Sequence, residues 1–208
     1  MKTKQIYEEY MIPKNLQEHM LRVAALAEVL LENWTKGNID KSEIIKACLF
    51  HDIAKPITFD PVKQLQYGMS YKDIERLKQL QERLKTKYGI VEHDVSVAIC
   101  KEIGLSEAAV NIVSLSEWAN IPRLLEENNL NSLVEIYCDM RIGPKGILSL
   151  KARLLDLERR VPSKNHEIYF SNGNLLEEKI KNNVQIDVNS ITDQQINSSF
   201  QDLLDFIF

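Results

Sequence analysis

Residues 49–56 read LFHDIAKP and place a histidine–aspartate doublet, His51-Asp52, at the end of an apolar helical pattern. His51 follows Ile44 and Cys48 on the inward side of the helix that this spacing predicts. Burying an imidazole beside a carboxylate costs several kcal/mol unless a partner or a metal compensates. The doublet therefore indicates a buried polar site.

Two further polar residues lie on apolar helical faces. His19 shares a face with Val23, and Asp139 lies three residues from both Ile136 and Ile142. A lone histidine on such a face is more often a core side chain bonded to a backbone carbonyl. Three inward sites with imidazoles and carboxylates favour a metal site instead, suited to Mn, Fe, Mg, Co, Ni or Zn.

Composition limits the class of protein. The chain has 208 residues, 44% of them hydrophobic and 27% charged, which fits one large domain or one domain with an appendage. The net charge of −4 argues against a nucleic-acid partner. No apolar run is long enough to span a membrane. The three cysteines suit buried thiols in a reducing compartment, so we expect a cytoplasmic protein.

The periodicity predicts an all-α protein. Helix-start signals include possible capping boxes at Ser70 with Asp73 and at Thr192 with Gln195. The expected helices cover residues 3–9, 14–34, 40–55, 70–88, 92–103, 106–118, 130–141, 147–160 and 175–181, with a short helix opening near 122 and a last one beginning near 192.

The character of the chain changes near Val161. We expect a main domain over residues 1–161, and over 162–208 a linker with a C-terminal helical extension. Residues 162–173 are polar and predict turns. The apolar C-terminal end is expected to dock on its own domain or on a second subunit, so a homodimer is one possible arrangement. A membrane surface is disfavoured because no cationic residue follows Asp187.

The polar residues occur in three segments, HMLRVAALAEVL, LFHDIAKP and EIYCDMRIGPKG. In this context and order the sequence resembles the HD-domain superfamily of metal-dependent phosphohydrolases, over about residues 13–160. The resemblance implies an HD-domain helical bundle. It also implies one divalent metal ion, of the kinds named above, held by His19, His51, Asp52 and Asp139.

The implied activity is hydrolysis of a phosphate ester of a small molecule, a nucleotide by family analogy, with Asp52 also orienting the water. Lys55 projects on the same side as Asp52 and His51 and could neutralise phosphate charge. A solvated lysine before Pro56 is the alternative for that residue. The alternative function is a sensor module with the same fold that binds a nucleotide or a metal without turnover.

Two arginines are candidates for substrate binding. Arg22 lies one turn after His19 and could clamp a phosphate, or it could pair with Glu18. Arg141 follows Asp139 by two residues, so it reaches the site only if the helix loosens toward Gly143.

His93, in GIVEHDVSVAICKEIGL, resembles the histidine that many superfamily members carry after the doublet, where it binds substrate phosphate or a second metal. We therefore expect it at the substrate. Asp94 is better explained as a first-turn acid. No histidine lies between His93 and Asp139, which argues against a second metal ion. Glu117 in this segment offers a substitute ligand.

Overall fold

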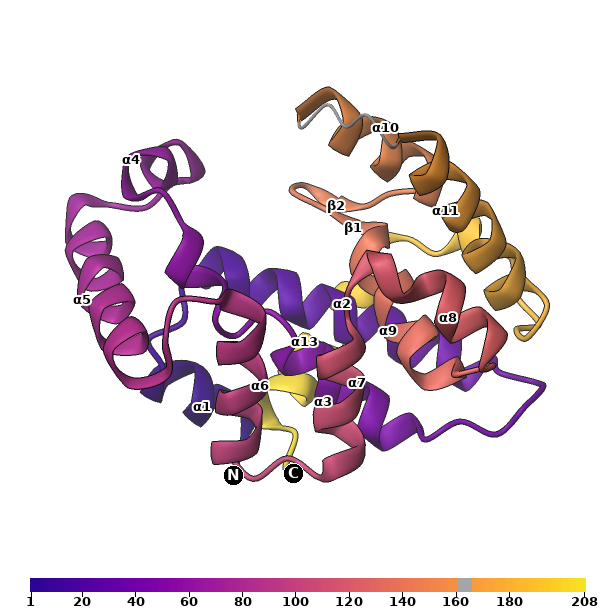
Figure 1. The fold of residues 1–208 in the computed structure, drawn as a ribbon, viewed down its shortest axis with the longest axis horizontal. Coiled ribbons are helices and arrows are strands. Elements are labelled where there is room, and N and C mark those ends of the chain that lie inside the picture. Colours follow the sequence, from indigo (N-terminus) through magenta and orange to yellow (C-terminus); the bar gives the residue numbers. More distant parts are fainter. Residues whose placement is uncertain (161–165) are drawn as a thin grey trace.

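The computed structural model describes residues 1–160 and 166–208, which are helical apart from turns and one two-stranded hairpin (Figure 1). This confirms the all-α class. The α-helices are α1 (Thr3–Glu9), α2 (Lys14–Glu32), α3 (Lys41–Phe50), α4 (Pro61–Gln64), α5 (Tyr71–Tyr88), α6 (Glu92–Glu102), α7 (Glu107–Leu115), α8 (Ile121–Glu126), α9 (Leu130–Arg141), α10 (Leu150–Arg160), α11 (His166–Lys181), α12 (Asp193–Asn197) and α13 (Phe200–Asp205). The short 3₁₀ turns are η1 (Lys55–Thr58), η2 (Leu65–Tyr67), η3 (Trp118–Asn120) and η4 (Val188–Ser190), and strands β1 (Ile142–Gly143) and β2 (Gly146–Ile147) are antiparallel.

Helix α2 lies at the centre of the bundle and packs against α3, α9, α12 and α13. Its inward residues, among them Met20, Val23 and Leu30, are fully buried, as their spacing predicts. Figure 1 shows α5 at one end of the molecule and the α10–α11 pair at the other. Within the described residues, no helix combines the length and apolarity that crossing a bilayer requires.

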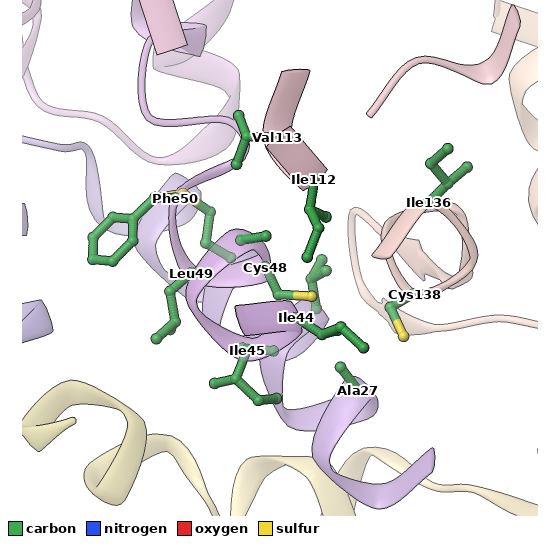
Figure 2. Close-up of a cluster of buried hydrophobic side chains, with 14 of the residues drawn as sticks. Ala27, Ile44, Ile45, Cys48, Leu49, Phe50, Ile112, Val113, Ile136 and Cys138 are labelled. Atoms are coloured by element: carbon green, nitrogen blue, oxygen red, sulfur yellow. The ribbon is translucent and has the colours of Figure 1, made fainter. Parts of the chain in front are cut away.

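Helix α3 carries the doublet into the core. The Asp40 side chain accepts a hydrogen bond from the Glu43 amide (3.2 Å) and so fixes the start of the helix. Figure 2 shows side chains of α3, including Cys48, packed toward α7 and α9. The α-helix ends at Phe50, before the expected end near Pro56, and tighter turns follow. His51 and Asp52 therefore lie where the helical geometry relaxes.

The segment after α10 differs from the expected turn-rich linker. Residues 162–165 lie outside the described residues, but helix α11 already begins at His166 and runs through Gly173. A Cβ at Gly173 would lie 2.8 Å from Leu154 Cδ1 of α10. Close packing against α10 thus explains a glycine inside a helix, and this packing outweighs the local turn preference.

Other expected helices also have different bounds. The helix expected over 147–160 begins at Leu150, because Ile142 to Ile147 form the hairpin. The last helix is divided into α12 and α13, and the predicted capping box of Thr192 and Gln195 starts α12. The capping box of Ser70 and Asp73 is also present.

The C-terminal extension docks on its own bundle, which was one of the two expected arrangements. Helix α13 packs against α1 and α2 (Figure 1). The backbones of Lys2 and Ile207 form an isolated antiparallel β-bridge. The Phe208 ring lies edge-on to the Phe50 ring, with 5.1 Å between the ring centroids. The extension therefore contacts the residue that precedes His51.

Arg141, at the end of α9, is buried with 1% of its surface exposed. Its guanidinium donates hydrogen bonds to the hydroxyl of Tyr137 (2.6 Å) and to the backbone carbonyls of Val188 (3.1 Å) and Leu148. A cation at a helix C-terminus is also favoured by the helix dipole. Arg141 thus ties the extension to α9.

We expect Arg141→Met to lower the free energy of unfolding by about 3 kcal/mol, because buried acceptors lose their donor. Urea unfolding followed by circular dichroism measures this change. The control is Arg123→Ala, an exposed arginine of α8 in one surface ion pair, with an expected change within about 0.5 kcal/mol. Equal stability of Arg141→Met and wild type would contradict the anchoring role.

Candidate metal centre

Three helices bring the polar residues together. His19 extends from α2, Asp139 from α9, and the doublet from the end of α3. One ligand atom each from His19, His51 and Asp139 lie within 4.8 Å of one another. The Oδ1 atom of Asp139 is 3.0 Å from His19 Nε2 and 3.5 Å from His51 Nε2.

Asp52 lies beside this three-residue group, although it is not one of the residues whose ligand atoms all lie within 4.8 Å of one another. Its Oδ2 atom lies 3.7 Å from His19 Nε2 and 3.8 Å from His51 Nε2. Its Oδ1 atom lies 3.4 Å from Lys55 Nζ. The two oxygens of this carboxylate therefore serve different neighbours.

His51 is held in an orientation that suits a metal ligand. Its Nδ1 atom lies 2.9 Å from the backbone carbonyl of Cys48, which can only accept a hydrogen bond. Nδ1 therefore carries a proton, and Nε2 points at the cluster. Within the described residues, Nε2 is buried and makes no hydrogen bond. Metal-binding histidines are typically oriented by such a bond from the other nitrogen.

The electrostatics of the cluster favour a cation. Burial lowers the pKa of His51, but the carboxylates of Asp52 and Asp139 outweigh it and raise this pKa to about 10. Burial raises the pKa of Asp139, but the imidazoles of His51 and His19 hold it well below its ordinary value. The carboxylates thus favour a positive charge at this point, which a divalent ion would supply.

These residues fit a divalent ion. Two imidazoles and two carboxylates form a borderline-to-hard donor set, and the free Nε2 of His51 supplies a buried donor directed at the common point. His19, Asp52 and Asp139 keep between 19% and 36% of their side-chain surface exposed. One side of the cluster therefore remains open to a small molecule.

Glu135 is a part of this region that the sequence analysis missed. It is fully buried on α9, and its Oε2 atom accepts a hydrogen bond from Ser116 (2.5 Å). Its Oε1 atom lies 3.9 Å from His51 Nδ1, and burial raises the pKa of this carboxyl to about 7. The signal was its position four residues before Asp139, on the same helical face.

Glu92 is the second missed residue. Its Oε1 atom lies 3.1 Å from Lys55 Nζ, so Lys55 sits between Glu92 and Asp52. The Thr58 hydroxyl donates a hydrogen bond to Glu92 Oε2 (2.8 Å). This contact could not be predicted from local patterns, because Glu92 and Lys55 are brought together only by the packing of α6 on η1.

The remaining candidates lie outside the cluster. Arg22 pairs with Glu18 over 3.3 Å, which is the alternative considered for it. The Nε2 atom of His93 lies 3.1 Å from the backbone carbonyl of Ser114, a typical partner for a packed histidine.

Arg141 is directed into the packing of the extension, as described above, and α9 stays helical through this residue. The loosening toward Gly143 on which its substrate-binding role depended does not occur. Arg141 is therefore assigned to the structure of the bundle rather than to the site.

A cavity of about 610 Å³ lies apart from the cluster, between the start of α2 and the start of α5. Asn15, one helical turn before His19, lines it, but none of the four cluster residues does. Its lining combines apolar side chains with Glu8, Lys14, Asp73 and Arg76, so its charges balance. The cavity adds no group to the centre.

The HD-domain family model matches residues 16–140 and so includes all four cluster residues. No curated protein and no solved structure matches the chain. The family match covers more than half of the sequence. The chain therefore belongs to the HD-domain superfamily of metal-dependent phosphohydrolases.

Proposed function

We propose that this protein hydrolyses a phosphate ester of a small molecule with one divalent metal ion held by His19, His51, Asp52 and Asp139. The observation that carries the proposal is the convergence of His19, His51 and Asp139 from three segments, with His51 Nε2 buried and without a hydrogen-bond partner in the described residues. Asp52 lies next to them, 3.7 Å from His19 Nε2. When bound, such an ion lowers the pKa of water and polarises a phosphoryl oxygen.

Asp52 would orient the attacking water. Its Oδ2 atom faces the metal-binding cluster, whereas Oδ1 is directed to the side of Lys55. An acceptor at that position can take a hydrogen bond from water and align it with a phosphate. The carboxylate is four-fifths buried, so its orientation is fixed.

Lys55 would bind the phosphate as a cation. Burial lowers its pKa, but Asp52 and Glu92 outweigh this effect and raise the pKa above its ordinary value. The ammonium therefore stays charged and retains donors for phosphate oxygens. Its side chain is 42% exposed, which leaves it accessible from solvent. Charge that develops on the phosphoryl group would be stabilised there.

The proposed substrate is a nucleotide. Family membership supports a phosphorylated small molecule, and the accessible side of the centre supports access by such a compound. Mono-, di- and cyclic nucleotides therefore form the first panel of substrates. Arg22 and His93 stay in the proposal only as residues that could approach a larger substrate.

We expect Asp52→Ala to lose both metal retention and hydrolysis, because it removes a ligand and the water-orienting acceptor together. The loss of metal affinity should exceed the roughly 10–100-fold that the loss of an outer partner costs. Metal analysis after loading with Mn²⁺ or Co²⁺, and phosphate release from the nucleotide panel, measure the two effects. Asp202→Ala, which alters an exposed acid of α13, should leave both unchanged. Normal metal content and turnover in Asp52→Ala would refute the assignment.

We expect Lys55→Ala to keep the metal but to lower kcat/KM by about 100-fold, because a phosphate-binding cation is lost. Steady-state kinetics with metal content measured on the same samples test this. Lys63→Ala is the matched control, since Lys63 is exposed and forms no ion pair within the described part of the chain. Unchanged kinetics in Lys55→Ala would show that this lysine does not bind the substrate phosphate.

The same experiments separate the enzyme from a sensor. A wild-type protein that binds the metal and nucleotides but releases no product from any of them would establish a binding module. Turnover that requires the metal would establish the enzyme.

A further inference from the structure

Helix α6 holds the segment after the doublet through one of its faces. Ser96 Oγ accepts a hydrogen bond from the buried amide of Ala54 (3.3 Å), and Glu92, one turn earlier, contacts Lys55. Residues four apart on a helix lie on the same side. The same face of α6 thus fixes the backbone of the segment and the direction of its lysine.

Next to the metal cluster, Asp52, Lys55 and Glu92 form a row of alternating charged side chains. Lys55 Nζ lies 3.4 Å from Asp52 Oδ1 and 3.1 Å from Glu92 Oε1, while Thr58 occupies the other oxygen of Glu92. The side chain of Glu92 is 24% exposed, so its ion pair with Lys55 is partly shielded from water. Each oxygen of Glu92 has one partner, which fixes its carboxylate.

This arrangement bears on the strength of Asp52 as a ligand. If Asp52 were the only carboxylate near Lys55, the ammonium would form a close ion pair with it. Opposite charges at short range attract strongly where water is partly excluded. The ammonium would then compete with a metal ion for the negative charge of Asp52. A second carboxylate on the far side of Lys55 offsets this attraction.

We propose that Glu92 is a positioning residue that holds Lys55 between two carboxylates, so that Asp52 stays available to the metal and Lys55 stays directed toward the substrate phosphate. This inference rests on the proposed function. The alternative is a partly exposed ion pair that contributes nothing measurable, as many such pairs do.

The test measures the Mn²⁺ affinity of the full-length protein by titration calorimetry. Glu92→Gln removes the charge and keeps an oxygen that can accept the Thr58 hydrogen bond. We expect its Mn²⁺ affinity to fall by about tenfold, as for the loss of other outer partners. The matched control is Asp94→Asn, which removes an exposed acid from the same first turn of α6 and should leave the affinity unchanged.

A double-mutant cycle tests whether Glu92 acts through Lys55. In a Lys55→Gln background, Glu92→Gln should weaken Mn²⁺ binding by less than about threefold, because no ammonium remains to compete for Asp52. Thermal unfolding of each variant shows whether it is folded. An equal loss in both backgrounds, or no loss in either, would overturn the inference.

The outcome is separable from that of the proposed function because the readout is metal binding. A wild-type protein that binds Mn²⁺ but hydrolyses none of the nucleotides would end the proposed function, and the cycle would still decide the role of Glu92. A wild-type protein that binds no Mn²⁺ would overturn both.

Discussion

Polar side chains from α2, from α9 and from the end of α3 meet at one place inside the bundle: His19, His51 and Asp139 converge, and Asp52 lies beside them. The imidazole nitrogens and carboxylate oxygens lie 3.0 to 3.8 Å apart, and the side chain of His51 is only 4% exposed, so each polar group depends on the others for a partner. The three helices must therefore meet at one position, and α2 with its fully buried face is the element that fixes it. The accessible side of the cluster is what remains for a substrate.

The C-terminal extension supports this position from two directions. Arg141, two residues after Asp139, binds the carbonyl of Val188 in the extension. The Phe208 ring contacts Phe50, the residue before His51. Ligand-bearing ends of both α3 and α9 are thus held by the same segment. The extension is therefore better described as a part of the scaffold of the centre than as an appendage.

Sequence patterns within one helix predicted the features that are determined within that helix. The bounds of α1 and α9, two capping boxes and the inward faces of His19, His51 and Asp139 follow from helical spacing and cap chemistry, whereas their meeting at one site was implied by the family resemblance. Tertiary contacts decided the rest. Gly173 is helical because α10 packs closely on it, and Arg141 is buried because the hairpin and the extension supply its acceptors. Leu154, which packs on Gly173, and Val188, which accepts from Arg141, lie too far away in sequence to be found by periodicity.

The two missed acids show how the protein divides negative charge around the centre. Glu135 is fully buried behind His51 and is held by Ser116, whereas Glu92 is partly exposed beyond Lys55 and is held by Thr58. The buried acid has a raised pKa and so contributes less charge near neutral pH, which limits repulsion with Asp139 on the same helix. The exposed acid is balanced by a lysine. Asp52 and Asp139 are thereby the carboxylates that face the imidazoles directly and are positioned to bind an ion.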